Sequence, residues 1–122
     1  MRDSSSAAAL VVDDDDRERD VTAGALLDAG FAIIETTCGR QALNTLDHHP
    51  ELGWLVTELT LPDLDGVLVA QLARRKRPDL RVLVLSADPA RLATAAAFGY
   101  AVAAKPIRRR DFIASVKGLA GP

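Results

Sequence analysis

Four apolar runs of this chain are each followed at once by side chains that could take part in chemistry. In chain order, these side chains are those of Asp13, Asp14, Glu58, Ser86 and Lys105. Two carboxylates about 4 Å apart repel each other by about 4 kcal/mol at an effective dielectric constant of about 20. If the runs lie side by side, the three acids therefore need a compensating charge, which either a divalent cation or Lys105 could supply.

Mg²⁺ is the cation that suits these residue types best. It takes hard oxygen ligands, accepts one or two carboxylates directly and keeps water or substrate oxygens in its remaining positions. No histidine or cysteine lies near these residues, which argues against zinc. A hydroxyl such as that of Ser86 and an amine such as that of Lys105 are suited to hold the other oxygens of a phosphoryl group bound by such a cation.

The segments between these residues alternate between the strand pattern and the helix pattern. Short runs rich in Val, Ile, Leu and Ala predict strands at residues 7–12, 31–36, 53–58, 80–85 and 100–104. Apolar residues at helical spacing predict helices at residues 16–29, 39–49, 67–76, 89–98 and 109–119. Val21 belongs to this spacing in the first helix, and Leu68 belongs to it in the third.

Five strands that alternate with five helices imply parallel pairing through right-handed crossovers. The expected fold class is therefore α/β, a three-layer αβα sandwich around a five-stranded parallel sheet. In such a sheet the ligand crevice lies at the carboxyl ends of the strands. The acids, the hydroxyl and the amine would then face one site.

Length and composition restrict the class of protein further. The 122 residues suit a single domain, which we expect at residues 7–120 after a polar lead-in at residues 1–6. Cys38 is the only cysteine, and no signal-like apolar run is present, so we expect a cytoplasmic setting. No segment approaches the roughly 18 apolar residues of a membrane span. A net charge of -2 and few aromatic residues argue against direct binding to nucleic acid.

Four motifs resemble those of the receiver domain of two-component response regulators. They are Leu10-Val11-Val12-Asp13-Asp14, Leu61-Pro62-Asp63-Leu64-Asp65-Gly66, Val84-Leu85-Ser86-Ala87 and Lys105-Pro106, in that order over nearly the whole chain. Each motif alone is weak evidence, whereas four in this order and spacing are strong. The resemblance implies a flavodoxin-like (βα)5 fold in which an aspartate at the end of the third strand accepts a phosphoryl group from a histidine kinase with Mg²⁺.

The resemblance also implies a role for each site residue. By position, Asp13 and Asp14 match the metal-binding acidic pair, Ser86 matches the phosphoryl-binding hydroxyl and Lys105 the phosphoryl-binding amine. We expect weak binding of Mg²⁺. Its expected ligands are the carboxylates of Asp13, Asp14 and Glu58 and the backbone carbonyl of Thr60.

The chain departs from the family at the acceptor. Glu58 stands where the family has its phospho-accepting aspartate, four residues before Pro62 and seven before Asp65. The added methylene moves the carboxylate outward by more than about 1 Å, and transfer chemistry is sensitive to displacements of that order. Three interpretations of Glu58 stay open: a permanently acidic stand-in for a phosphorylated aspartate, an inactive acceptor in a scaffold, and a working acceptor.

The sequence therefore predicts an atypical receiver that acts in two-component signalling by binding a partner and is not efficiently phosphorylated. The expected partners are a histidine kinase or another signalling protein, and a second copy bound through the fourth helix, the fifth strand and the fifth helix. One alternative is a receiver that takes phosphate from a histidine kinase. The other, an Mg²⁺-dependent phosphoryl-transfer enzyme with Asp13 or Asp14 as nucleophile, is disfavoured because such a phosphatase normally encloses its substrate with a cap or insertions.

Overall fold

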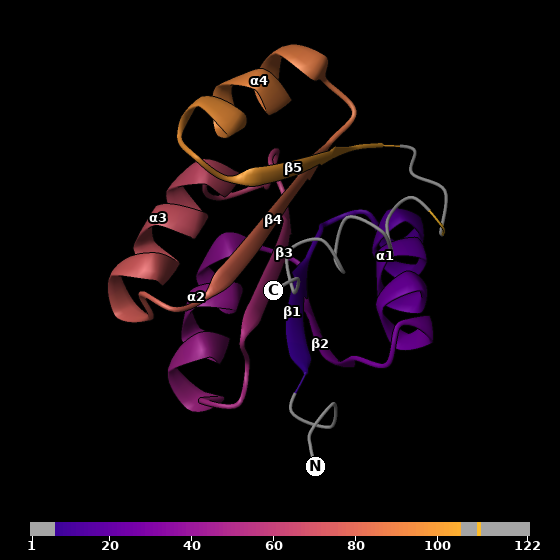
Figure 1. The fold of residues 1–122 in the computed structure, drawn as a ribbon, viewed down its shortest axis with the longest axis vertical. Helices are drawn as coiled ribbons and strands as arrows, with labels where there is room; N and C mark the ends of the chain where they lie inside the picture. Colours follow the sequence, from indigo (N-terminus) through magenta and orange to yellow (C-terminus); the bar gives the residue numbers. More distant parts are fainter. Residues whose placement is uncertain (1–6, 106–109, 111–122) are drawn as a thin grey trace.

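A central sheet with helices on both faces forms the described part of the molecule (Figure 1). The structure, a computed structural model, describes residues 7–105 and residue 110. Within these residues the elements are β1 (Ala8–Val12), α1 (Asp16–Asp28), β2 (Ala32–Thr36), α2 (Gly39–His48), β3 (Trp54–Glu58), α3 (Gly66–Lys76), β4 (Arg81–Ser86), α4 (Pro89–Ala97) and β5 (Ala101–Ala104). Among the described residues, none of the helices has the length and the apolar character of a membrane span.

All five strands are parallel and follow the order β2-β1-β3-β4-β5. This is the flavodoxin-like order, so the predicted parallel α/β sandwich is confirmed. The chain runs from β1 outward to β2 and then returns past β1 to β3. Ligands of such sheets bind outside the carboxyl ends of the strands where the direction reverses, which here lies between β1 and β3.

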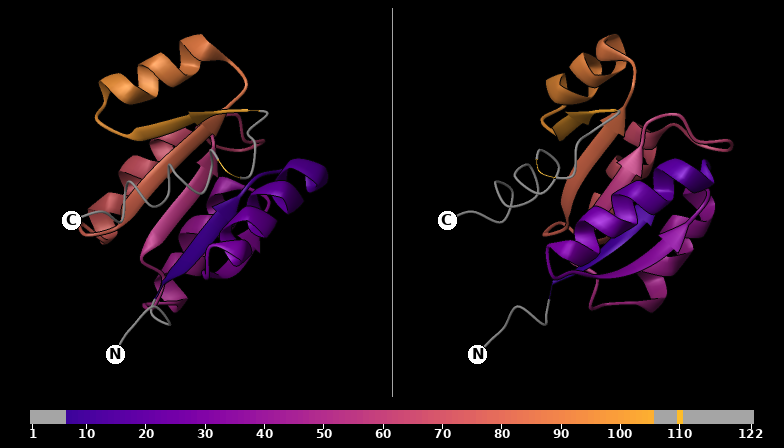
Figure 2. Two further views of the ribbon diagram at one scale, coloured as in Figure 1. Left: turned by 45° about the vertical axis from the view of Figure 1, so that its right-hand side comes forward. Right: turned by 90° about the vertical axis from the view of Figure 1, so that its right-hand side faces the viewer.

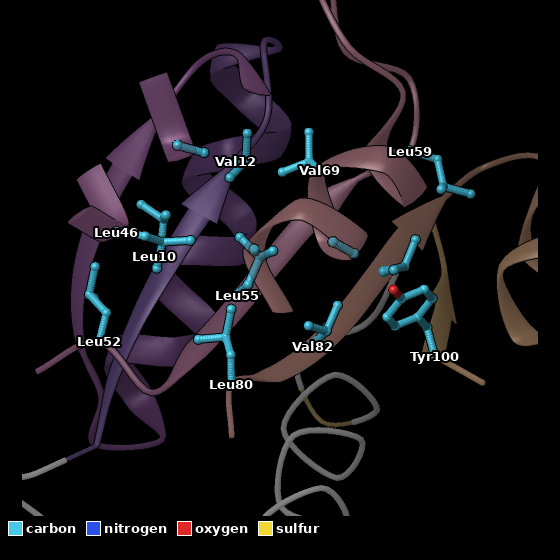
Figure 3. Packing of buried hydrophobic residues seen from close by; sticks show 14 of the residues in the cluster. Leu10, Val12, Leu46, Leu52, Leu55, Leu59, Val69, Leu80, Val82 and Tyr100 are labelled. Carbon is cyan, nitrogen blue, oxygen red and sulfur yellow. The ribbon is translucent and has the colours of Figure 1, made fainter. Parts of the chain in front are cut away.

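The sheet separates two hydrophobic cores. α2, α3 and α4 cover one face, and α1 covers the other, where it faces the viewer in the right-hand view of Figure 2. Leu10 and Leu55 point into the first core, which Figure 3 shows at close range, whereas Val11 and Val56 point into the second. Because successive side chains of a strand point to opposite faces, β1 and β3 are buried on both sides. This explains why they read as continuous apolar runs.

The predicted boundaries differ from the observed ones by no more than one residue for every element within residues 7–105. Two predicted helix positions differ in orientation: the side chains of Val21 and Leu68 are exposed, by 55% and 40%. The apolar face of each helix is therefore narrower than its spacing predicts, and in α1 the buried residues are Thr22, Ala23, Ala25 and Leu26. The predicted lead-in at 1–6 and the helix at 109–119 lie outside the described residues, except for Arg110, which is helical.

The loop between β3 and α3 is tied to the start of α2. One oxygen of the Asp63 carboxylate accepts the Gly39 N–H at 2.8 Å, and the other accepts the Arg40 N–H at 2.9 Å. The N-cap residue Cys38 makes no side-chain hydrogen bond of its own to these groups. Asp63 therefore caps α2 from a distant part of the sequence, and in doing so it fixes the loop that follows Glu58.

Candidate functional site

The predicted site residues lie at the carboxyl ends of four adjacent strands of the sheet. Val12 pairs with Thr57, so Asp13 and Glu58, the residues that follow them, extend from neighbouring strands. Ser86 pairs with Ala104, which immediately precedes Lys105. The register thus brings together side chains that are up to 92 positions apart in the chain.

Asp13 is buried at the end of β1, with only 2% of its surface exposed. Its Oδ1 accepts the N–H of Asp15 at 3.0 Å, and its backbone carbonyl accepts a hydrogen bond from Arg19 Nη1 at 2.9 Å. These bonds hold the turn between β1 and α1. They leave Oδ2 directed toward the centre of the site, where it meets Lys105 at 2.6 Å.

Glu58 ends β3, and its carboxylate folds back over the loop that follows. Its Oε2 accepts the N–H of Leu59 at 2.6 Å and the N–H of Thr60 at 3.2 Å. Gly66, the first residue of α3, packs against this loop so closely that a Cβ there would lie 2.4 Å from the Glu58 carbonyl oxygen. The close approach of α3 therefore requires glycine.

The ammonium of Lys105 lies among three carboxylates, which we call the carboxylate cage: Asp13, Glu18 and Glu58. Nζ is 2.6 Å from Asp13 Oδ2, 2.5 Å from Glu18 Oε1 and 2.7 Å from Glu58 Oε1. An ammonium has three N–H donors, so the cage uses all of them. The Lys105 side chain is only 7% exposed.

The cage keeps this buried ammonium charged. Burial alone would lower the pKa of Lys105, because it penalises the charged form. The hydrogen bonds to Asp13, Glu18 and Glu58 outweigh that effect and hold the pKa of Lys105 well above its usual value. The site therefore contains a permanent positive charge supplied by the protein itself.

Glu18 belongs to the site although the sequence pattern did not predict it. It lies in the first turn of α1, and its backbone N–H is donated to the N-cap residue Asp15 at 2.9 Å. A glutamate at this position often returns a hydrogen bond to the N-cap N–H, in a capping box. Here that N–H is donated to Asp13, which frees the Glu18 carboxylate for Lys105. A D-x-x-E pattern starting three residues after a strand end is the signal that could have identified it.

The remaining predicted site residues do not enter the cage. Asp14 is exposed and is not among the described acids whose oxygens cluster with those of the cage. Thr60 is exposed, and its N–H is donated to Glu58. The Ser86 hydroxyl is buried on the neighbouring strand, where its Oγ accepts the N–H of Asp88 at 3.1 Å, just before α4. The structure thus gathers Asp13, Glu58 and Lys105, with Ser86 beside them.

The cage has the donor atoms that a divalent cation prefers. One oxygen from each of its three carboxylates lies within 4.8 Å of the other two, and Mg²⁺ takes carboxylate oxygens. Each of these acids also accepts a hydrogen bond from Lys105. The residues therefore fit Mg²⁺ by chemical type, but the ammonium competes for the same three acids.

The same fold occurs in solved receiver structures. A response regulator from Chloroflexus aurantiacus J-10-fl has a TM-score of 0.84 at 24% identity and covers 93% of this chain and 96% of its own. The chemotaxis response regulator CheY4 of Vibrio cholerae has a TM-score of 0.83 at 20% identity, with 93% and 98% covered. CheY of Borrelia burgdorferi, solved as a CheX-CheY-BeF3-Mg complex, has a TM-score of 0.85 at 21% identity, with 95% and 90% covered.

Comparison with families gives the assignment. Among curated proteins there is no significant match to this chain. The family model described as the response regulator receiver domain, however, matches residues 9–117. Since this match includes all nine described elements except the first residue of β1, the chain belongs to the family of response regulator receiver domains.

Proposed function

We propose that this chain is an atypical receiver in which Glu58 occupies the phosphoacceptor position as a fixed acid, and that it signals by binding a partner without being efficiently phosphorylated. The observation that carries this proposal is that both oxygens of the Glu58 carboxylate are engaged. Oε1 accepts a hydrogen bond from Lys105, and Oε2 accepts two backbone N–H groups of the following loop.

An acceptor carboxylate must present a free oxygen lone pair in line with the incoming phosphorus atom. Charge-assisted hydrogen bonds such as the one from Lys105 are among the stronger ones. The three bonds leave Glu58 one of its about four lone pairs, on the oxygen that Lys105 already holds, so they lower the reactivity of the carboxylate toward phosphorus. The resemblance implies that Lys105 binds a phosphoryl oxygen of a phosphorylated aspartate. Here Lys105 binds a carboxylate oxygen of Glu58 in that place. This supports the interpretation of Glu58 as an acidic stand-in.

Mg²⁺ would have a limited part in such a receiver. Asp13, Glu18 and Glu58 could hold it only when Lys105 withdraws, so we propose that binding is weak. The roles of Asp14 and the Thr60 carbonyl as ligands remain predictions. If it were bound there, Mg²⁺ would supply positive charge that neutralises the oxygens of a phosphoryl group.

The proposed partner is a histidine kinase or another signalling protein, and the proposed second mode is a homodimer through α4, β5 and the predicted fifth helix. The B. burgdorferi relative was solved in complex with another protein, CheX. In this chain, α4 exposes Ala93 and Ala97 and is followed by Phe98, which is 58% exposed. Light scattering on the wild-type chain and on Phe98→Asp would test the homodimer, which predicts a mass near two chains that falls to one in the variant.

The proposed function is tested by incubating the chain with acetyl phosphate and Mg²⁺ and measuring its intact mass. The expected result is an unchanged mass, because its hydrogen bonds make Glu58 a poor nucleophile. A stable added phosphoryl group that maps to Glu58 would instead support the alternative, a receiver that takes phosphate from a histidine kinase. Turnover of an aryl phosphate that Asp13→Asn abolishes would support the phosphoryl-transfer enzyme.

The cellular compartment of the protein and the bounds of its domain remain proposals as well. We propose one receiver domain at residues 7–120 in a cytoplasmic setting, where a lone cysteine such as Cys38 stays reduced.

A further inference from the structure

Glu18 provides the solvent-facing wall of the carboxylate cage. Its two partner acids are shielded, with side chains 3% exposed for Asp13 and 12% exposed for Glu58, whereas the Glu18 side chain is 50% exposed. The Lys105 ammonium that all three contact is almost completely buried. Glu18 is therefore the cage member that stands between the ammonium and the solvent.

The position of Glu18 is fixed by the first turn of α1. Arg19, the next residue, anchors that turn through three contacts: to the Asp13 carbonyl at 2.9 Å, to Asp16 at 2.7 Å and to Glu35 on β2 at 3.2 Å. The N–H that a capping glutamate would otherwise bind is taken by Asp13. The reach of Glu18 toward Lys105 is thus built into the junction between β1 and α1.

We propose that Glu18 is a positioning residue that holds the Lys105 ammonium in the place a divalent cation would take, so that the protein's own amine excludes Mg²⁺ from this pocket. The inference rests on the proposed function, because both concern the same site. All three N–H donors of Lys105 are used within the cage, so none remains for a phosphoryl oxygen. Glu18 closes this arrangement from the solvent side.

Calorimetric titration of the full chain with Mg²⁺ tests the competition. Lys105→Met should bind Mg²⁺ at least about tenfold more tightly than wild type, because three clustered carboxylates lose their internal cation. Adding Glu18→Gln to Lys105→Met should weaken binding by at least about tenfold, since it removes one ligand. In the presence of Lys105, the same change should alter the dissociation constant by less than about threefold, because losing a ligand and loosening the ammonium oppose each other.

Asp20→Asn is the matched control. It removes one acid from an exposed position of the same helix, outside the cage, and should alter the dissociation constant by less than about threefold in either background. An unchanged affinity in Lys105→Met would overturn the proposal. So would a Glu18→Gln effect of equal size in both backgrounds, because Glu18 would then act only as a remote charge.

A second measurement avoids Lys105→Met, which could fail to fold without metal. In the chain labelled with ¹⁵N-lysine, a caged ammonium exchanges its hydrogens with water slowly and should give an NMR signal that solvent-exposed ammonium groups lack. Lys76→Met identifies the signal of the other described lysine. We expect the Lys105 signal in wild type and Asp20→Asn but not in Glu18→Gln. Its absence from wild type, or its persistence in Glu18→Gln, would contradict the cage.

The two proposals fail in different ways. A phosphoryl group on Glu58 after treatment with acetyl phosphate, with the ammonium signal of the untreated chain intact, would overturn the proposed function and leave the cage in place. An unchanged mass together with no ammonium signal would overturn the cage and leave the proposed function in place.

Discussion

At the residue scale, the main feature of the site is one buried amine that donates hydrogen bonds to three carboxylates. We predict that Lys105→Met lowers the free energy of unfolding by about 3 kcal/mol, because it leaves acids such as Asp13 buried without the ammonium that balances their charge. Lys76→Met is the control: Lys76 pairs with Asp47 in a half-exposed ion pair, and its loss should cost less than about 1 kcal/mol. Urea denaturation measures both, and equal losses would contradict this account of the site.

The pH dependence of this effect follows from the raised pKa of Lys105. A group whose pKa is higher in the folded state stabilises the fold fully below its unfolded pKa, near 10.5, and loses that contribution as the pH rises through the folded value. The deficit of Lys105→Met should therefore be the same at about pH 7 and about pH 9. Urea denaturation at the two values checks this, and a deficit that shrinks by half would be inconsistent with an ammonium held above its usual pKa.

Part of the site could be predicted from single residues. Asp13, Glu58 and Lys105 each end an apolar strand, and parallel strands bring such ends together. Glu18 could not be found in this way, because an exposed acid in a helix's first turn has an ordinary role there in favourable interaction with the helix dipole. The exposure of Asp14 could not be predicted either, because the turn that follows the strand determines the direction in which each neighbouring acid points.

At the element scale, close packing between α3 and the end of β3 places the Glu58 loop. We predict that Gly66→Ala costs about 1–3 kcal/mol of unfolding free energy, since its Cβ would lie 2.4 Å from the Glu58 carbonyl oxygen and 2.7 Å from Leu59 Cα. Gly24→Ala is the matched control, because a Cβ there meets nothing within 4 Å in α1, and it should add about 0.5–1 kcal/mol. Urea denaturation that showed the two changes to be alike would contradict the close packing at Gly66.

Residues from other segments cap the two ends of α2. The residue that caps its first turn, Asp63, has a carboxylate whose charge depends on pH. The N–H of Arg40, together with those of Gly39 and Leu64, holds the pKa of Asp63 below its usual value of 3.8. This contribution to stability is present above that value and is lost as the pH falls through the lower folded pKa.

We therefore predict that Asp63→Asn destabilises the chain at neutral pH and that its deficit relative to wild type shrinks below about pH 3.8. Urea denaturation at several pH values measures this. Asp79→Asn, at an exposed position, serves as the control and should show little deficit at any pH. A deficit of Asp63→Asn that stays constant down to low pH would show that the carboxylate's charge is not what caps α2.

The other end of α2 shows why such contacts escape sequence analysis. Arg77 follows α3, where a cation suits the end of its own helix. In the structure its guanidinium donates instead to the backbone carbonyls of Leu46, Pro50 and Leu52, at the end of α2 and in the loop beyond it. Helical spacing predicts which segment is a helix, but not which neighbouring segment supplies its caps.

At the scale of the whole molecule, one sheet joins two cores, so the described part should unfold as a unit. Trp54 reports on the core beneath α1, where its ring meets that of Phe31 edge to face at 5.3 Å. We predict that Trp54 fluorescence and far-ultraviolet circular dichroism give coincident urea transitions. A fluorescence transition that clearly precedes the loss of helix signal would mean that the two faces unfold separately.

The architecture itself was predictable because its determinants are local. Continuous apolar runs mark strands buried on both faces, and regular alternation with helices leaves parallel pairing as the natural solution. The outward orientation of Val21 and Leu68 was not predictable, because it depends on how far each helix is rotated about its axis against the sheet. The strand order places Asp13, Glu58 and Lys105 at the same end of the sheet. The pattern of apolar runs that predicts the fold therefore also predicts this part of the site.

The central claim is that Glu58 is a fixed acid held by Lys105 and the following loop. Its most direct test compares wild type with Glu58→Asp after treatment with acetyl phosphate and Mg²⁺, by intact mass and peptide mapping. The account predicts that wild type keeps its mass, whereas Glu58→Asp, whose carboxylate is one methylene shorter, gains one phosphoryl group. A stable phosphoryl group on Glu58 of the wild-type chain would contradict it.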